Sequence, residues 1–330
     1  MFIEDDPNAT FRLLKKEFIK RGYAYTEDLH GEQLYLSLIS PTGKAWEFYG
    51  SKITYPFTSV EVKRLSVHKE IATKYVENQG FSVPYTRYLV NNEQLTNHEA
   101  EDMIKKYGTL IVKPADDSLS RGLTLNITNS VSLNDAIKYS RQFKEGVLIQ
   151  EQVEGEEIRF VVIKGRVEAA LLRQTARIIG DGSSTIAMLI EKENNVRKSL
   201  SFPMMSYPQL TDMLIDPKLF TDITILPKDE IKELNRATMI KNGASVYNVI
   251  EKVHFSYTAV VEQLVESLHT DFIVVDMFVQ DYRTEKKDDN YWFIEFNTSP
   301  VLKLFYGCRD GNMFDIVPVL ADAIDEKLHA

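Results

Sequence analysis

The sequence contains a single cysteine, Cys308, among its 330 residues. One cysteine cannot form an intrachain disulfide, so we expect an intracellular setting rather than a disulfide-stapled secreted fold. A stretch of about 18 apolar residues is also missing, which excludes an ordinary membrane-spanning helix. The first seven residues are acidic and lack the basic-then-apolar plan of a secretory signal. We therefore expect a cytoplasmic protein without a membrane partner.

The chain has no excess of positive charge. It carries 39 Lys and Arg against 48 Asp and Glu, a formal net charge of −9. This balance argues against nucleic acid as the main partner, although a local basic cleft stays compatible with it. Internal repeats and low-complexity tracts are absent as well. The hydrophobic share of 44% is ordinary for globular proteins, and the length suits two or three domains.

A glycine-rich phosphate loop is also lacking. The polar loop at residues 115–122 joins two predicted strands and has one permissive residue, Gly122. Lys113 stands at its entry. Backbone N–H groups of such a loop can point at anions, and the lysine adds a positive charge, so the pattern favours a phosphate-covering hairpin. The alternative is that Lys113 is a strand-end lysine reaching solvent.

Acidic and amide side chains interrupt two strand-like stretches near the end of the chain, at residues 272–280 and 291–300. Asp276 lies inside an apolar run, while Glu295 and Asn297 are two apart and so share a strand face. Three hard oxygen donors on neighbouring strands can hold Mg²⁺. The alternative is a pair of edge strands with solvated acids.

The pattern of apolar residues divides the chain into three units. The first, residues 1–65, is predicted to be a small α/β module with a helix near 11–19 and strands at 33–39 and 45–49. For residues 66–150, helices are predicted at 67–80, 97–107 and 132–143, and strands at 109–114, 123–127 and 147–153. For residues 151–330, a strand is predicted at 167–172 and helices after Ser183 or Ser184, from Lys228, at 256–269 and at 312–328, with a long excursion over 196–226.

Several short segments occur in one order along residues 66–320. They are His68-Lys69, residues 111–114, 147–160, 178–186 and 275–276, and the run Ile294-Glu-Phe-Asn-Thr-Ser-Pro300. In this order they resemble the ATP-grasp superfamily of carboxylate–amine ligases, above all the ATP-grasp part of cyanophycin synthetase and of bifunctional bacterial glutathione synthetase. The resemblance implies an α/β (α+β) ATP-grasp fold, with a small subdomain at 66–150 and a large subdomain at 151–330 gripping ATP.

The resemblance also implies roles for individual residues. Nucleotide binding falls to Lys69 and Lys113 at the phosphates, to Gly122 in their cover, to Gln150, Glu151, Gln152 and Val153 at the adenine-facing hinge, and to Glu157 at the ribose. The metal falls to Asp276, Glu295 and Asn297, the acceptor side to Gly180, Asp181, Gly182 and Ser299, and the substrate carboxylate or transferring phosphoryl group to Arg173, Arg177 and Arg236. An alternative for Arg173 and Arg177 is pairing with surface acids, which are plentiful.

The implied activity joins an amino acid or peptide carboxylate to an amine through an acyl phosphate, with release of ADP. ATP and Mg²⁺ are the implied cofactors, with Mn²⁺ as an alternative ion, and the partners are small molecules. Two other readings stay open: a non-catalytic nucleotide-binding regulatory module, and a phosphotransferase acting on a hydroxyl. A homodimer is also left open, and the sequence does not name the acid or the amine.

Departures from the resembled pattern affect substrate choice more than ATP use. The hinge carries Gln150 where the relatives usually have a carboxylate, and Val301 follows Thr298-Ser-Pro where they have glycine. The loops at 116–122 and 241–245 each have one glycine fewer. Every expected metal ligand and phosphate lysine is nevertheless present.

Overall fold

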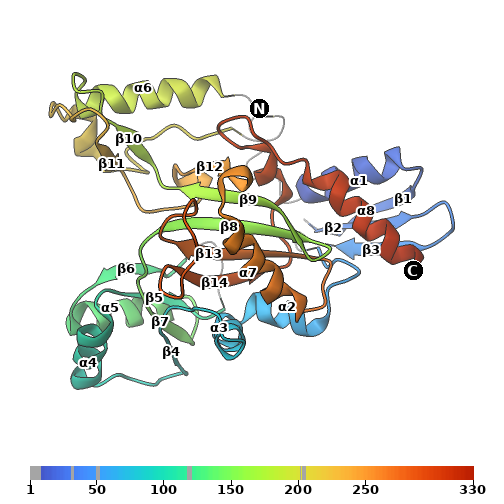
Figure 1. Cartoon of the computed structure of the whole chain (residues 1–330), viewed down its shortest axis with the longest axis horizontal. Helices are drawn as coiled ribbons and strands as arrows, with labels where there is room; N and C mark the ends of the chain where they lie inside the picture. Colours follow the sequence, from blue (N-terminus) through green and yellow to red (C-terminus); the bar gives the residue numbers. More distant parts are fainter. Residues whose placement is uncertain (1–8, 31–32, 50–52, 117–120, 201, 203–205) are drawn as a thin grey trace.

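The computed structural model describes residues 9–30, 33–49, 53–116, 121–200, 202 and 206–330. Within them, the strands form antiparallel sheets of three, four, five and two strands, with helices between and around them (Figure 1). No helix of the described residues is both long enough and apolar enough to cross a membrane.

The N-terminal unit is one helix packed on a three-stranded sheet. Its elements are α1 (Ala9–Lys20), β1 (Ala24–His30), β2 (Gln33–Ile39) and β3 (Ala45–Tyr49), with strand order β1-β2-β3. Phe11 and Phe18 recur at helical spacing on α1 and pack on Phe48 and Trp46 of β3. The predicted helix and two strands are therefore confirmed. The pattern missed β1, because residues 24–29 are all exposed and leave no apolar alternation to detect.

The second unit is a four-stranded sheet covered by two helices. The strands are β4 (Thr86–Leu89), β5 (Leu110–Pro114), β6 (Thr124–Ile127) and β7 (Val147–Glu151), in the order β4-β7-β5-β6; the helices are α4 (Asn97–Tyr107) and α5 (Ser130–Arg141). A capping box at Thr96 and Glu99 starts α4, where both residues satisfy free backbone N–H groups. Leu110, Val112 and Ile149 build the core under the helices. The predicted helices and strands of this unit are confirmed to within a few residues.

A five-stranded sheet forms the centre of the molecule. Its strands are β8 (Glu156–Ile163), β9 (Arg166–Gln174), β12 (Ser245–Asn248), β13 (Phe272–Val279) and β14 (Tyr291–Asn297), in the order β12-β9-β8-β13-β14. One face packs on α7 (Phe255–Glu266), α2 (Val60–Val67) and α3 (Lys69–Asn78), and the other on α8 (Ile316–His329) and a 3₁₀ turn, η4 (Leu302–Tyr306). The predicted helix at 67–80 corresponds to α3. The preceding helix α2, which ends at Val67, was not predicted, and His68, whose backbone is extended, separates the two.

The excursion between β9 and β12 carries its own small core. It contains β10 (Arg177–Ile179), β11 (Ile231–Glu233), α6 (Ile186–Ser199) and the 3₁₀ turns η1 (Pro217–Thr221) and η2 (Ile240–Asn242); a further turn, η3 (Ile250–Lys252), follows β12. The helix predicted from Lys228 is wrong. Asp229 donates its N–H to the carbonyl of Gly180, and Gly180 donates to the carbonyl of Glu230. Pairing with Gly180 thus uses the backbone groups that a helix there would need.

The start of α6 also differs from the prediction. Thr185 is the N-cap and accepts a hydrogen bond from the N–H of Met188. Ser183 and Ser184 instead donate their N–H groups to the carboxylate of Asp181 at 2.9 and 2.6 Å, which holds them in the turn before the helix.

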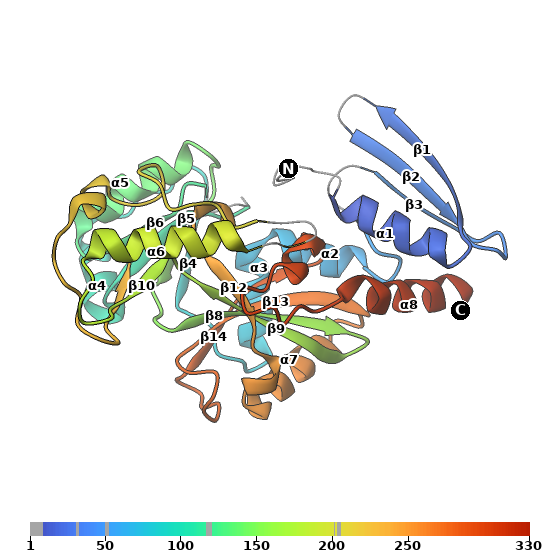
Figure 2. The same ribbon diagram turned by 90° about the horizontal axis from the view of Figure 1, so that it is seen from above.

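The N-terminal unit packs on the central sheet rather than standing apart. The edge of the Tyr55 ring meets Phe272 of β13 at a centroid distance of 5.0 Å, and Arg21 pairs with Asp322 of α8 at 2.5 Å. Figure 2 shows α1 and α8 close together at one end, with the four-stranded unit at the other. The domain limits at 65 and 150 remain predictions.

Candidate active site

Charged side chains gather on one face of the central sheet. In β8, Glu157 and Arg159 alternate with apolar residues and share the face of Val161. Across the register, Arg159 lies opposite Asp276 and Glu157 opposite Arg173. Directly opposed residues of neighbouring strands project to the same face. The face of the central sheet that packs on α8 at Val161 and Ile163 therefore carries charged side chains where β8 begins.

Arg159 and Asp276 form a buried, two-pronged ion pair. The Arg159 Nε and Nη2 atoms lie 2.7 and 2.6 Å from the Asp276 Oδ1 and Oδ2 atoms, and the residues are 7% and 1% exposed. Burial opposes ionisation of the Asp276 carboxyl, but the facing Arg159 guanidinium outweighs it and holds its pKa below the usual value. Asp276 is therefore a carboxylate at neutral pH.

A second pair lies beside the first. Arg173 Nη1 is 2.5 Å from Glu157 Oε1 and 3.7 Å from Asp276 Oδ2, while its Nε donates to the carbonyl of Thr238 at 3.2 Å. Burial raises the pKa of Glu157, and the positive charge of Arg173 opposes that rise. Arg173, which was predicted to serve the substrate side, thus lies within reach of both acids of this face.

The three predicted metal ligands lie on the two neighbouring strands β13 and β14. Asp276 is directly opposite Glu295, and Asn297 follows two residues later on the same strand. Glu295 Oε2 is 3.9 Å from Lys69 Nζ, and Asn297 Oδ1 accepts the N–H of Ser299 at 2.9 Å. Each carboxylate oxygen has two lone pairs, so the contact with Arg159 leaves acceptor capacity on Asp276. This donor set of two carboxylates and an amide oxygen fits Mg²⁺.

Two lysines face this site from the other side. Lys113, on β5, donates a hydrogen bond to Gln150 Oε1 at 2.9 Å, and the Gln150 amide nitrogen in turn donates to Thr86 Oγ1 at 2.8 Å. Burial and the nearby positive charge of Lys69 together lower the pKa of Lys113 to about 8. A buried lysine with a second positive charge beside it makes a favourable place for a phosphate. Lys113 is thus not the solvated strand end of the alternative reading.

The predicted hinge joins the four-stranded sheet to the central one. Glu151 pairs with Tyr85 through its N–H at 2.9 Å, and Gln152 Oε1 accepts the N–H of Asn126 at 2.7 Å. At Gly155, just before β8, an added Cβ would lie 2.3 Å from the carbonyl oxygen of Val279. A glycine is therefore required where the chain crosses from one sheet to the other.

Glycine is equally required at the end of the phosphate-covering hairpin. Gly122 has a φ of +68°, and an added Cβ would lie 2.8 Å from the side chains of Pro114 and Phe143. The hairpin residues 117–120 lie outside the described part of the chain.

Other predicted residues lie outside the charged face. Arg177, on β10, is 3.5 Å from Glu233, so its observed contact is the surface pairing of the alternative reading. Asp181 holds the turn before α6 and pairs with Lys192 at 2.8 Å. Arg236 donates to Asn126 and so links the excursion to the four-stranded unit. The remaining residues of the predicted acceptor side make hydrogen bonds within the fold. The N–H of Gly180 donates to the carbonyl of Glu230, and that of Gly182 to the carbonyl of Leu226. The hydroxyl of Ser299 donates to the carbonyl of Ile53.

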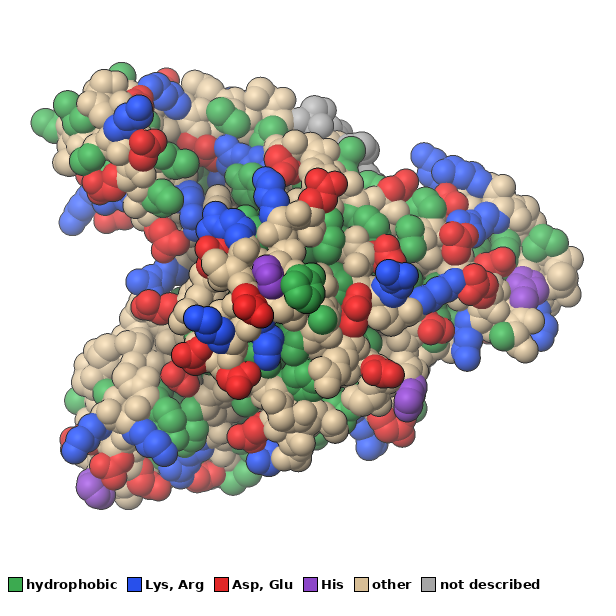
Figure 3. All heavy atoms as spheres, viewed as in Figure 1, with side chains coloured by type: hydrophobic (Ala, Val, Ile, Leu, Met, Phe, Trp, Pro, Cys, Tyr) green, Lys and Arg blue, Asp and Glu red, His purple; other side chains and the backbone are tan. Residues whose placement is uncertain are grey.

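Sequence reasoning missed Arg159 and a cavity beside it. Arg159 carried a detectable signal, because Glu157 and Arg159 are charges two apart in an otherwise apolar strand, opposite the acid at Asp276. The cavity, of about 210 Å³, had no such signal, since its walls come from β8, β9, η2, β12 and η4. Figure 3 shows the surface hollowed between the lobe of α6 and the lobe of α4 and α5, with both basic and acidic side chains along the hollow.

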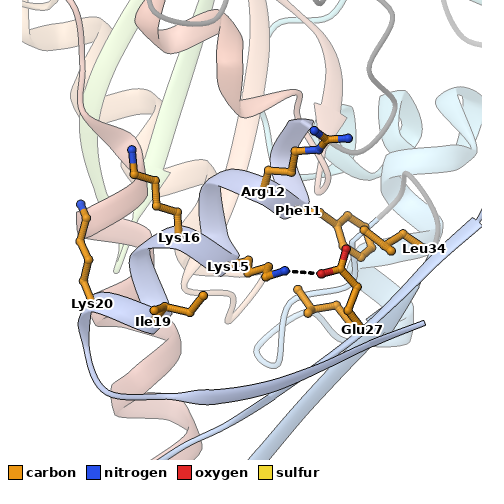
Figure 4. Close-up of a pocket in the computed structure, with 9 residues that line it drawn as sticks. Phe11, Arg12, Lys15, Lys16, Ile19, Lys20, Glu27 and Leu34 are labelled. Carbon is orange, nitrogen blue, oxygen red and sulfur yellow. Dashed lines mark hydrogen bonds and ion pairs between the residues drawn. The ribbon is translucent and has the colours of Figure 1, made fainter. Parts of the chain in front are cut away.

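A second cavity, of about 630 Å³, lies in the N-terminal unit, and α1, β1 and β2 supply its lining. In Figure 4, Lys15 reaches across to Glu27, while Arg12, Lys16 and Lys20 follow one side of the helix. None of the lining residues of this groove belongs to the charged face, and Figure 1 shows α1, β1 and β2 at one end of the molecule.

No family model matches the chain. Among curated proteins, the glutathione biosynthesis bifunctional protein of Streptococcus agalactiae is 24% identical over 273 residues, covering 78% of this chain and 36% of that protein. The cyanophycin synthetase of Trichormus variabilis is 23% identical over 270 residues, covering 79% of this chain and 29% of that protein. The chain thus spans about a third of the length of the curated relatives it matches.

Among solved structures, a bifunctional glutathione synthetase from Pasteurella multocida superposes with a TM-score of 0.64 at 18% identity. The match covers 95% of this chain and 43% of that one. At this identity the likeness establishes the fold. The chain is a relative of the glutathione biosynthesis bifunctional proteins and the cyanophycin synthetases, and it has the ATP-grasp fold that the sequence predicted.

Proposed function

We propose that the chain is an ADP-forming carboxylate–amine ligase that activates an acid with ATP. The observation that carries the proposal is the charged face of the central sheet. It places the donors Asp276, Glu295 and Asn297 beside the guanidinium groups of Arg159 and Arg173, facing the lysines at 69 and 113. This combination suits a site where a phosphoryl group passes to a carboxylate.

In this proposal Lys69 and Lys113 hold the nucleotide phosphates. The lowered pKa of Lys113 supports this, because an anion beside it would restore the stability of its ammonium form. Mg²⁺, held by Asp276, Glu295 and Asn297, would neutralise charge on the phosphate oxygens. Gln150 positions the Lys113 ammonium by accepting a hydrogen bond from it. A carboxylate at this hinge position, as the resemblance implies for the relatives, would hold the ammonium by charge as well.

The acid substrate is a poor electrophile until it is phosphorylated. One of its carboxylate oxygens attacks the γ-phosphorus of ATP, and ADP leaves with the electrons of the broken P–O bond. The amine then attacks the acyl carbon, inorganic phosphate leaves, and the amine loses a proton. In this proposal Arg173, which lies beside Asp276, holds the carboxylate with the guanidinium N–H groups that Glu157 and Thr238 do not occupy. Positioning and charge supply the catalysis, with no dedicated general base assigned.

Two other functions use the same fold and are separated by one assay. A phosphotransferase acting on a hydroxyl would release ADP with an alcohol alone, and a regulatory module would bind nucleotide without turnover. ADP release should be measured against pairs of amino acids and dipeptides, with and without an added amine. The ligase proposal predicts release that requires an acid and yields a new amide. Release driven by a hydroxyl compound, or no release with any pair, would contradict it.

A further inference from the structure

The cavity of about 210 Å³ opens directly onto the charged face. Arg159 and Arg173 line one end of it, and both touch Asp276 of the predicted metal site. A group in the cavity with a carboxylate at this end would therefore present that carboxylate to the site of phosphorylation. The volume is below the roughly 300–1,000 Å³ of pockets for drug-sized ligands, so it suits a single residue-sized group.

Apart from Thr238, Lys241 and Lys303, the rest of the cavity lining is apolar. Its wall combines side chains from the central sheet with two short segments that cover the sheet, and its members are Leu171, Met239, Ile240, Val246, Val301 and Leu304. A charged or amide side chain placed against such a wall would lose its water without gaining a partner there. An aliphatic side chain would gain from the same burial.

The charged residues of the lining restrict the class of ligand further. The charged residues among the described lining are all basic: Arg159, Arg173, Lys241 and Lys303. Arg159 and Arg173 each pair with an acid, Asp276 and Glu157, while Lys241 and Lys303 add positive charge to the lining, so the cavity favours a ligand that carries negative charge. A free amino acid also carries an ammonium group, which this basic lining disfavours. A peptide bond at the same nitrogen carries no charge.

We propose that this cavity binds the C-terminal aliphatic residue of a short peptide, which is the acid that the ligase activates. The inference rests on the proposed ligase function and adds the class of acid. The terminal carboxylate lies at Arg159 and Arg173, the aliphatic side chain lies against the apolar wall, and the rest of the peptide leaves through the opening of the cavity.

The first experiment separates the acid from the unknown amine. Hydroxylamine traps an acyl phosphate as a hydroxamate: its nitrogen attacks the acyl carbon and inorganic phosphate leaves. With Mg·ATP saturating, the acids compared are N-acetyl-leucine, its near-isostere N-acetyl-asparagine, N-acetyl-glutamate, Nα-acetyl-lysine and free leucine. We expect kcat/KM for N-acetyl-leucine to exceed each of the others by at least about tenfold. Higher kcat/KM for any of the others would overturn the assignment.

The second experiment changes the wall. Met239→Asp places a carboxylate on it and should lower kcat/KM for N-acetyl-leucine by at least about tenfold while raising that for Nα-acetyl-lysine. The control is Met213→Asp at a position that is 90% exposed, which should leave both values unchanged. Circular dichroism checks that both variants fold. An unchanged preference in a folded Met239→Asp protein would place the side chain elsewhere.

Binding distinguishes failure of this inference from failure of the ligase proposal. Calorimetry with N-acetyl-leucine, in the presence of Mg²⁺ and a non-hydrolysable ATP analogue, tests the site without turnover. Binding that Met239→Asp abolishes supports the cavity even where hydroxamate does not form, in which case the ligase proposal alone fails. Absence of both binding and turnover with N-acetyl-leucine, while another acid is activated, overturns the cavity assignment alone.

Discussion

At the scale of single residues, the site depends on buried charges that satisfy one another. Asp276 stays ionised because Arg159 faces it with two hydrogen bonds, and Glu157 is balanced by Arg173. Removing one partner of such a pair leaves a buried charge unpaired, which typically destabilises a protein by about 3–5 kcal/mol. The stability of the fold and the proposed catalysis therefore rest on the same few side chains.

Arg159→Ala should lower the free energy of unfolding by about 3–5 kcal/mol at pH 7. In the parent chain the lowered pKa of Asp276 stabilises the fold above the usual aspartate range, and this contribution is lost as pH falls through that lowered pKa. In the variant, burial raises the pKa of Asp276, so the sign reverses and the deficit should shrink between pH 7 and pH 4. Urea unfolding over this range measures both. The exposed-site control Arg64→Ala should stay within about 0.5 kcal/mol at each pH.

Nucleotide binding should take up a proton near pH 8. The pKa of Lys113 is about 8 because burial and Lys69 disfavour its charge, and a phosphate nearby would raise it. At pH 8 about half a proton should therefore be taken up on binding, and less at pH 6.5, where the lysine is already charged. Calorimetry with ATP in buffers of different ionisation enthalpy measures this number. Lys113→Met should bind ATP more weakly and take up less; unchanged affinity and uptake would remove Lys113 from the phosphate site.

Residues of the candidate site could be predicted from the sequence only where the alternation of side chains along one strand placed them on a common face. Glu295 and Asn297 were predicted to share a face because they are two residues apart in an aromatic strand. The same argument, applied to residues 157 and 159, would have identified Arg159 as a site residue. The partnership of Arg173 with Glu157 depends on the pairing of β8 with β9, and strand register is not readable from either strand alone. The cavity depends on five separated segments and lay beyond sequence reasoning.

At the scale of elements, capped and periodic segments were predicted well. The helix α4 has its capping box written in the sequence, and the aromatic strands β13 and β14 fall where their apolar runs do. Around Lys228 the residues favoured a helix, but tertiary pairing with Gly180 decided the outcome. The turn at 180–182 is thus the feature that organises the excursion, whatever its part in binding an acceptor.

Gly180→Ala should destabilise this excursion. An added Cβ would lie 1.8 Å from the carbonyl oxygen of Pro227, and backbone cannot move aside without breaking the β10–β11 pairing. We expect a loss of about 1–3 kcal/mol in urea unfolding, as for other overpacked sites. The control is Gly43→Ala, where nothing lies within 4 Å of an added Cβ and only the positive φ of +85° opposes the substitution, so the loss should be smaller. A loss in Gly180→Ala no larger than that in Gly43→Ala would show that the contact with Pro227 does not govern stability at this position.

At the scale of the whole molecule, two sheets supply opposite halves of one site. The four-stranded sheet contributes Lys113, the central sheet contributes Asp276 and Glu295, and one short connection before Gly155 joins them. A ligand that contacts both halves stabilises the folded chain in proportion to its binding free energy.

Mg²⁺ with a non-hydrolysable ATP analogue at about 100 times its Kd should stabilise the fold by about 2.7 kcal/mol, seen as a higher Tm. Glu295→Gln should leave the Tm without ligand nearly unchanged, since this side chain is partly exposed, but should remove the Mg²⁺-dependent part of the shift. ADP release should fall by at least about 100-fold. The exposed control Glu266→Gln should match the parent in all three measurements. Retention of most ADP release by Glu295→Gln would exclude Glu295 as a metal ligand.

The single cysteine has a practical consequence for measuring conformational change by site-specific labelling. Cys308 is fully buried, and burial raises the pKa of its thiol to about 12, so it offers thiol reagents neither access nor a thiolate. The native surface therefore behaves, toward such reagents, as if it were free of cysteine. Two cysteines introduced at exposed positions, such as Tyr139 on α5 and Met188 on α6, can carry a fluorophore pair without deleting Cys308. Their energy transfer would report directly whether the lobes on either side of the hollow approach when nucleotide binds.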